Sequence, residues 1–381
     1  MKKKVVVALS GGVDSAVTAY LLKKEGYEVI CVFMQNWDNY LNDNYSSEVC
    51  TQNRDWKDAC EVATQLQIPI FKITFIKEYW NEVFSVFLRK LEEGLTPNPD
   101  ILCNKIIKFN YFLEYVKKHF QPDLIATGHY AKVVLNKKKY YLEKAKDEKK
   151  DQTYFLCQIS RGILDKIIFP LADYKKKEVR EIARDIGLKN AVKKDSVGIC
   201  FVGQQGNNFV NFLKNYLPEK KGDIQNFISG KKVGEHQGVH FFTIGQRRKL
   251  FLFNQQEANF VVGKDIINNI LFVVTDFNNP QLYSSWCLVT DFNWMIPLEE
   301  LSGIEKSQKN SAKFRHQQVE VKVKFKILDS NNNQVLIKFI KKQRAITPGQ
   351  AAVLYHGNIC LGGGIILNTE RNKSSGEPIT S

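Results

Sequence analysis

Apolar runs alternate with helical periodicity along residues 1–125. Residues 5–9 (VVVAL) are five consecutive apolar positions, which is typical of a parallel strand that is covered on both faces. Further strand-like segments lie at 28–33, 68–75 and 123–127, and helical patterns lie at 54–67, 77–92 and 106–118. Strands that alternate with helices in this way predict an α/β fold with a doubly wound parallel sheet. Ligands bind such sheets at the carboxyl ends of the strands.

The pattern changes after two helical segments, at 174–187 and 207–217, which end at Gly187 and before Pro218. Shorter apolar segments follow and predict strands at 239–244, 259–262 and 270–275. From residue 282 onward the period is two, and strands at 319–327, 335–340, 351–355 and 359–367 predict a small barrel. We therefore predict a doubly wound sheet, a small mixed β-rich domain and a C-terminal β-barrel, at 1–217, 218–281 and 282–381.

Composition narrows the possible partners. Hydrophobic residues make up 44% of the chain, but no apolar run is long enough to cross a membrane and no signal peptide is evident. We expect a cytoplasmic protein without a membrane partner. Its eight cysteines have no CxxC or zinc spacing, so we expect thiols and no metal centre. The net charge of +15 favours a polyanionic partner, although a generally lysine-rich composition would give the same charge.

A glycine turn, Ser10–Gly11–Gly12–Val13–Asp14–Ser15, follows the first strand. The glycines allow positive φ and a close backbone approach to a ligand, and the following helix offers unpaired N–H groups to an anion. This is not a Walker loop, because no lysine sits where the β- and γ-phosphates would be gripped. Asp14 would repel a bare phosphate, so a bridging Mg²⁺ is expected. The alternative is an ordinary corner capped by Ser15, but SGGVDS resembles the pyrophosphatase-loop signature of ATP-dependent adenylating enzymes.

Two cysteines lie in stretches with further chemical groups. In 96–104 (TPNPDILCN), two prolines favour an extended chain, and the predicted helix that follows places Cys103 near its N-terminus. That position lowers a thiol pKa, and Asp100 lies within reach as a proton acceptor or donor. Cys200 lies in a short apolar run between glycines. Either cysteine alone could be a buried structural residue, but two of them beside an ATP-activating loop suggest thiol chemistry.

Motifs in a fixed order resemble the tRNA-specific 2-thiouridylase family over nearly the whole chain. They are SGGVDS, TPNPDILCNKIIKF (96–109), ATGHYA (126–131), KDQTYFL (150–156), PLADYKKKEVREIA (170–183), DSVGICFVG (195–203), VHFFTIGQRR (239–248) and TPGQAAVLY (347–355). The resemblance implies an adenine-nucleotide hydrolase-like fold and ATP-dependent thiolation of the wobble uridine in tRNAs for Lys, Glu and Gln. It also implies a sulfur donor protein, either a cysteine desulfurase or a persulfide relay protein.

The same resemblance implies roles for individual residues. The ATP-binding residues would be Ala8, Leu9, Ser10, Gly11, Gly12, Val13, Asp14, Ser15, Met34 and Gly128. The target uracil would face Asn98, Pro99 and Asp100, and the other tRNA contacts would be His129, Lys150, Asp151, Gln152, Arg315, His316 and Gln350. Cys200 would carry a persulfide, with Cys103 as its partner thiol and Asp100 as the acid or base. The chain departs from the family at Lys249, which replaces a usual glycine, and at Val197 and Ile106.

The chemistry is consistent with this assignment. The C2 oxygen of uracil is a poor leaving group, and adenylation by ATP would convert it to AMP and release pyrophosphate. A persulfide could then attack C2, and a wobble base must be splayed out of its loop to be reached. Two alternatives remain: a different adenylating enzyme with an ammonia source, and an RNA-binding protein with a degenerate nucleotide fold. Pyrophosphate release that depends on tRNA would separate the three.

Overall fold

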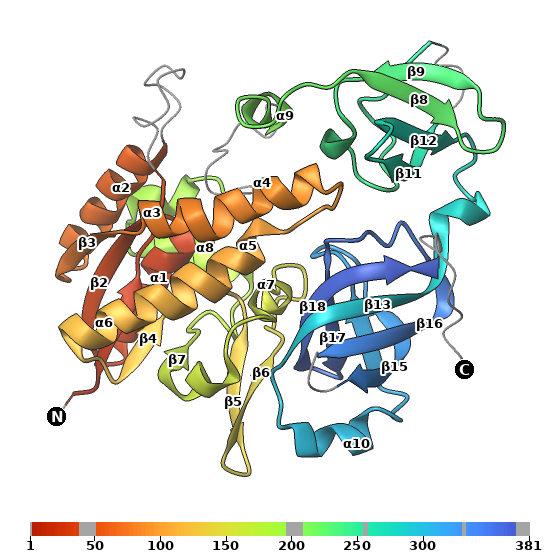
Figure 1. Ribbon diagram of the computed structural model, residues 1–381. Coiled ribbons are helices and arrows are strands. Elements are labelled where there is room, and N and C mark those ends of the chain that lie inside the picture. Colours follow the sequence, from red (N-terminus) through yellow and green to blue (C-terminus); the bar gives the residue numbers. More distant parts are fainter. Residues whose placement is uncertain (1, 38–50, 196–208, 254–257, 330–332, 371–381) are drawn as a thin grey trace.

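The computed structural model describes residues 2–37, 51–195, 209–253, 258–329 and 333–370. Figure 1 shows an α/β domain, a small sheet domain and a barrel, with the barrel beside the β5–β6 hairpin of the first domain. No helix in these ranges is long and apolar enough to cross a membrane.

The first domain is built on a parallel sheet with the strand order β3-β2-β1-β4-β7. The strands are β1 (Lys4–Ala8), β2 (Glu28–Gln35), β3 (Ile70–Thr74), β4 (Leu124–Ala126) and β7 (Ile167–Ile168). Val5 and Val7 point into one apolar layer, whereas Val6 and Ala8 point into the other. The predicted parallel sheet, covered on both faces, is therefore confirmed.

Two groups of helices cover this sheet. One face packs against α1 (Val13–Lys24), α2 (Thr51–Gln65), α8 (Lys176–Asp185) and η4 (Lys189–Val192). The other face packs against three helices. The first consists of α3 (Ile76–Tyr79), η1 (Trp80–Phe84) and α4 (Ser85–Glu92), and the second of α5 (Pro99–Leu102), η2 (Cys103–Tyr111) and α6 (Phe112–Phe120). The third is α9 (Phe209–Leu213).

The central sheet has the strand order β10-β9-β8-β12-β11. The strands are β8 (Gly222–Asn226), β9 (Lys232–His236), β10 (Phe251–Leu252), β11 (Phe260–Asp265) and β12 (Ile270–Val274). The predicted strand at 239–244 is wrong, because the chain forms a 3₁₀ turn there, η5 (Val239–Phe241). Gly238 enters this turn at φ +147°, and Val239, Phe242 and Ile244 are then buried under the sheet, a spacing that does not have the strand period of two.

The C-terminal sheet is a barrel. Among the described strands, six form a ring in the order β13-β16-β15-β14-β17-β18, and pairing of β13 with β18 closes it. They are β13 (Tyr283–Trp294), β14 (Asn310–Lys313), β15 (Val321–Asp329), β16 (Gln334–Arg344), β17 (Ala351–His356) and β18 (Ile359–Thr369). Val323 and Phe325 point into the barrel, whereas Lys322, Lys324 and Lys326 are exposed. The predicted barrel is confirmed, although β15 starts later than expected and Val319 is 85% exposed.

The barrel and the first domain share an apolar core. A hairpin of the first domain, β5 (Lys132–Asn136) and β6 (Lys139–Glu143), joins the barrel sheet where Glu143 pairs with Ile359. Behind it, Tyr154 follows the hairpin and donates its hydroxyl to Ala351 O at 3.1 Å, and Tyr154 packs in the same cluster as Tyr355. Both tyrosines are fully buried. The two parts of the chain are therefore packed as one body.

Candidate active site

The loop after β1 is held in shape by its own serines. Ser15 Oγ donates to Gly12 O at 3.1 Å and accepts from Ser10 N at 3.1 Å. Gly12 is the N-cap of α1, so Ser15 braces the loop and does not cap the helix. Gly11 has φ +75°, and a Cβ there would lie 2.2 Å from Asp55 O. The first-turn amides of α1 therefore face the carboxyl edge of the sheet from a fixed loop, which is a favourable arrangement for an anion.

Two further candidate ATP residues lie on neighbouring strands. Met34 is near the end of β2, and Gly128 follows β4; both strands pair with β1. A Cβ on Gly128 would lie 2.8 Å from Ser15 N and 2.9 Å from the carbonyl carbon of Asp14. Gly128 therefore packs directly on the start of α1. The structure brings the predicted loop residues, Met34 and Gly128 to the same edge of the sheet.

Lys176 at the start of α8 supplies the cation that the loop itself lacks. Its Nζ donates to both carboxylate oxygens of Asp14, at 2.7 and 2.8 Å, and lies 2.7 Å from Asp195 Oδ1. Tyr130 OH also donates to Asp14 Oδ1 at 2.9 Å. The sequence analysis found no lysine within the loop itself, and the structure brings one to the loop from elsewhere in the chain. Lys176 lies 162 positions away, so loop spacing could not reveal it, although it falls within the quoted motif at 170–183.

Asp195 joins three cations beside this loop. It accepts from Lys150 Nζ at 2.8 Å and from Arg180 NH2 at 2.7 Å, in addition to its ion pair with Lys176. Burial alone would raise the pKa of Asp195, but the hydrogen bonds from Lys150 and Lys176 outweigh it and hold the pKa at about 2. Burial and the Asp14 charge raise the pKa of Tyr130, so its phenol stays protonated as a donor.

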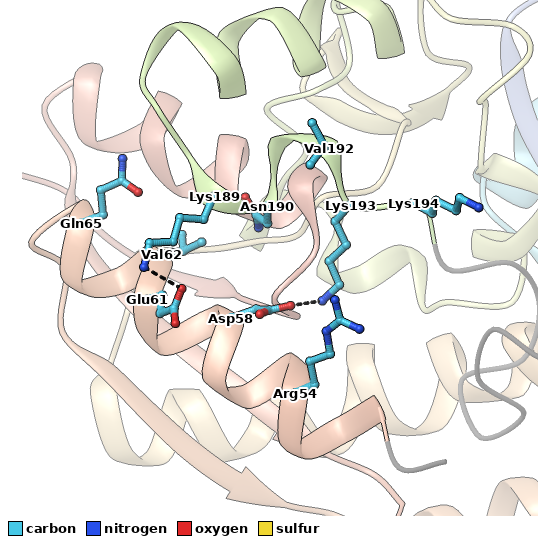
Figure 2. Close-up of a pocket in the computed structure, with 10 residues that line it drawn as sticks. All are labelled: Arg54, Asp58, Glu61, Val62, Gln65, Lys189, Asn190, Val192, Lys193 and Lys194. Carbon is cyan, nitrogen blue, oxygen red and sulfur yellow. Dashed lines mark hydrogen bonds and ion pairs between the residues drawn. The ribbon is translucent and has the colours of Figure 1, made fainter. Parts of the chain in front are cut away.

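A cavity of about 310 Å³ opens behind the loop, between α2 and η4. Figure 2 shows Lys193 joined to Asp58 of α2 at this cavity. Lys193 Nζ donates to Asp55 Oδ1 at 2.7 Å, to Asp58 and to Gly11 O at 3.2 Å. Asn190, 5% exposed, donates Nδ2 to the same carbonyl at 3.2 Å. Two side chains missed by the sequence analysis therefore fix the Gly11 carbonyl, and with it the orientation of the loop.

Cys103 is the fifth residue of a helix that starts earlier than the predicted residue 106. The helix begins at Pro99, and Asn98 Oδ1 caps it by accepting from Asp100 N at 3.0 Å and Ile101 N at 3.3 Å. Proline is tolerated in the first turn, where its missing N–H costs nothing. Cys103 is 4% exposed. Cys200 and Val197 lie outside the described residues.

Burial raises the pKa of the Asp100 carboxyl, and the Lys108 charge partly opposes this shift. Asp100 is half-buried and lies less than one helical turn before Cys103. The pKa shift brings the carboxyl closer to neutral pH, where a group can both take and give a proton. These properties are suited to an acid or base next to the thiol.

The predicted tRNA residues of the first domain are mostly bonded internally. His129 is buried, its Nδ1 lies 2.7 Å from Thr127 Oγ1, and burial followed by the Lys108 charge lowers its pKa well below the usual value. Asp151 is also buried and accepts from Ala145 N at 3.1 Å. Gln152 Oε1 accepts from the backbone of Tyr130 at 3.0 Å. Lys150 bonds to Asp195 beside the SGGVDS loop, and Asp151 lies 3.8 Å from Lys313 Nζ of the barrel, so residues 150–152 connect the loop with the barrel.

The predicted tRNA residues of the barrel contact the two other domains. Arg315 NH2 donates to Ile244 O at 3.2 Å and to Ala345 O at 3.0 Å, and Gln350 Nε2 donates to Thr96 O at 2.8 Å. His316 lies against the Phe155 ring, with centroids 4.4 Å apart, and its buried Nδ1 has no hydrogen-bond partner among the described residues. A groove of about 940 Å³ lies between the first domain and the barrel and is lined by residues of both. Its lining includes Lys144, Lys149, Asp151, Lys313 and His316.

Three family models match successive parts of the chain. They are described as a tRNA methyl transferase HUP domain (residues 3–204), a tRNA methyl transferase PRC-barrel domain (210–275) and an aminomethyltransferase beta-barrel domain (284–366). Over 374 residues the chain is 47% identical to the tRNA-specific 2-thiouridylase MnmA of Mycoplasma capricolum, covering 96% of this chain and 99% of that protein. It is 47% identical to the protein of the same name from Limosilactobacillus fermentum, with 97% of both covered. Among solved structures, a 4-thiouridine synthetase–RNA complex with bound ATP has a TM-score of 0.32 and 16% identity, over 57% of this chain and 50% of that one.

Proposed function

Because the chain belongs to the tRNA-specific 2-thiouridylase family and is a tRNA sulfurtransferase, we propose that it thiolates the wobble uridine of tRNAs for Lys, Glu and Gln. ATP activates the C2 oxygen of the base, and a cysteine persulfide supplies the sulfur. The observation that carries the proposal is the rigid Ser10–Ser15 loop at the carboxyl edge of the parallel sheet, with Lys176 beside it. A loop that grips pyrophosphate suits cleavage between the α- and β-phosphates.

In the first step the loop binds the pyrophosphate part of ATP. The first-turn amides of α1 and the hydroxyl of Ser10 face the phosphates, and Lys176 contributes its positive charge. Asp14 would hold a Mg²⁺ ion, which would neutralise phosphate charge. Both of its oxygens accept from the Lys176 ammonium in this structure, so a Mg²⁺ ion would have to displace that lysine. Transfer of AMP to the C2 oxygen then releases pyrophosphate.

In the second step sulfur replaces the activated oxygen. The outer sulfur of a Cys200 persulfide attacks C2, and the C2 oxygen leaves with AMP. The Cys103 thiolate then attacks the inner sulfur of Cys200, which breaks the sulfur–sulfur bond, leaves 2-thiouridine and joins the two cysteines in a disulfide. Asp100 takes or gives the protons, for which its raised pKa is suited. A thiol reductant resets the disulfide, and a cysteine desulfurase or persulfide relay protein reloads Cys200.

The tRNA would lie across the groove between the first domain and the barrel. Lys144, Lys149 and Lys313 line this groove, and the buried Nδ1 of His316, beside Phe155, has no hydrogen-bond partner within the described ranges. The groove lining also carries as many carboxylates as lysines, so the positive charge that suits a phosphate backbone would come from the exposed lysines on β15. Asn98, Pro99 and Asp100 would face the extruded uracil. Further contacts to the tRNA would come from His129, Lys150, Asp151, Gln152, Arg315 and Gln350.

The test combines pyrophosphate release with mass spectrometry of the tRNA nucleosides. Wild-type protein with ATP, tRNA and a sulfur donor should release pyrophosphate and form 2-thiouridine. Cys200→Ser should fail to load a persulfide, whereas Cys103→Ser should load one without completing thiolation. Persulfide found mainly on Cys103, or full thiolation by either variant, would refute these roles. Pyrophosphate release that does not need tRNA would instead favour a different adenylating enzyme.

A further inference from the structure

The central domain contacts the backbone just before the helix that carries Asp100 and Cys103. Lys264 Nζ, from β11, donates to Gly94 O at 3.0 Å. Gly94 has φ +78°, and a Cβ there would lie 2.4 Å from Ile266 Cδ1. The backbone at Gly94 is therefore in close contact with the central domain, and its carbonyl accepts a hydrogen bond from that domain.

The barrel holds the same short segment from another direction. Thr96 N donates to Pro348 O at 3.0 Å, and Thr96 O accepts from Gln350 Nε2 at 2.8 Å. Gly349 has φ +88°, and a Cβ on it would lie 2.6 Å from Thr96 N. Residues 94–96 thus lie between two domains, with both backbone groups of Thr96 used by the barrel. We name this arrangement the 94–96 clamp.

The clamp is directly connected to the reacting groups. Asn98, two residues beyond Thr96, caps the helix through Asp100 N, and Cys103 follows in the same helix. Two residues span at most about 7 Å, so a shift of the clamped backbone is passed to the helix start with little slack. A misplacement of ~1 Å at a reacting group can cost about 100-fold in rate.

If Lys264 served only to hold the domains together, burying its ammonium group would be an unfavourable way to do so. It is half-buried and has no ion pair with a carboxylate of the described residues, and burial lowers its pKa to about 8. Apolar packing already joins the domains, because Phe241 of η5 packs on the core of the first domain and on that of the central domain. A methionine would fill the space of the lysine stem without the cost of desolvating an ammonium group. The directed bond to Gly94 O is what such a substitution would remove.

We propose that Lys264 is a positioning residue for thiolation, which acts through the Gly94–Thr96 backbone to place Asp100 and Cys103 against the activated uracil. The proposal rests on the function proposed above. It gives the central domain a part in the chemistry, although none of its residues needs to touch the substrate.

The test is Lys264→Met, with Lys231→Met as the control because Lys231 is an exposed lysine of the same domain. We expect kcat for 2-thiouridine formation to fall roughly tenfold, which corresponds to ~1.4 kcal/mol, with KM for ATP and for tRNA nearly unchanged. Backbone amides of residues 94–103 should exchange hydrogen faster, while those of β1 and α1 should not. Lys264→Arg, which retains an N–H donor, should restore most of the rate.

Other outcomes would overturn the proposal. A raised KM for tRNA with unchanged kcat would make Lys264 a tRNA contact. Faster exchange throughout the first and central domains would make it a docking residue only. If hydrogen exchange of the backbone amides of residues 94–103 were unchanged in Lys264→Met, Lys264 would not hold this segment in place and the proposal would be wrong. Hydrogen exchange needs no activity, so it still judges the clamp if the wild-type protein proves not to form 2-thiouridine, in which case the proposed function is what fails.

Discussion

Replacing Lys176 by methionine tests the central electrostatic argument of the active site. The substitution keeps the aliphatic stem and removes an ammonium group that lies 2.7 Å from one oxygen of Asp14 and 2.7 Å from one oxygen of Asp195. The lysine side chain is only 12% exposed, whereas the two carboxylates are 31% and 30% exposed. Water can therefore compensate the carboxylates in part but can reach the lysine poorly.

The magnitude follows from these contacts. A hydrogen bond to a charged group contributes ~1.5–3 kcal/mol, and Asp195 keeps Lys150 and Arg180 after the substitution. We therefore expect the free energy of unfolding to fall by ~3 kcal/mol at neutral pH, mostly through Asp14. Loss of the positive charge at the phosphate site should lower tRNA-dependent pyrophosphate release by about 100-fold or more.

The assays are urea unfolding and a coupled measurement of pyrophosphate. Lys177→Met is the matched control, because its side chain is 87% exposed and its helical pair with Glu181 is worth ~0.3–0.5 kcal/mol. Adding Asp14→Asn to Lys176→Met should recover part of the lost stability, since it removes the unpaired carboxylate. The reasoning is refuted if Lys176→Met is as stable as Lys177→Met, or if it releases pyrophosphate at the wild-type rate.

Three further substitutions test other parts of the structure. Burial lowers the pKa of Lys264 to about 8 in the folded state, below the usual 10.5, so between these values the lysine binds fewer protons when the protein is folded. The free energy of unfolding of the wild type, measured in urea relative to that of Lys264→Met, should therefore increase from pH 8 to 10.5, and a constant difference would contradict the burial of this ammonium group. Lys249→Gly should raise the melting temperature, because Lys249 has φ +64° and a left-handed non-glycine residue costs ~1–2 kcal/mol. Gly128→Ala should abolish pyrophosphate release while circular dichroism keeps the barrel signal, since its Cβ would strike Ser15 N; an active variant would contradict the packing described here.

Local sequence was sufficient for the elements whose pattern is short-range. The apolar run at 5–9 and the SGGVDS turn predict β1, the loop and the start of α1, because each depends on neighbouring residues. The same holds for β17 and β18, where apolar strands flank a Gly357 turn. The helix start at Pro99 was missed, because the two prolines favoured an extended chain and the helix was predicted only from residue 106. An asparagine directly before a proline is nevertheless a common helix start.

The rest of the site depends on contacts between distant parts of the chain. Lys176 and Lys193 reach the loop from 162 and 182 positions away, and a lysine in a basic chain carries no mark of its partner. The central-domain bond from Lys264 to Gly94 spans 170 positions. At 239–244 the apolar residues suited either a strand or a short turn, and packing beneath the central sheet decided for the turn. Only three-dimensional packing could supply these assignments.

The apolar core that Tyr154 shares with Tyr355 has a consequence for how the enzyme can fail. Because the two tyrosines pack in one cluster, the ATP-binding half and the barrel should unfold as one unit. A chain cut after residue 281 would leave Tyr154 and its neighbours facing water, so a stable adenylating fragment is not to be expected. A damaging substitution in β17 would then reduce the amount of folded nucleotide-binding protein, even though it lies more than 300 residues from the SGGVDS loop. Loss of activity alone would therefore not locate a lesion in this enzyme.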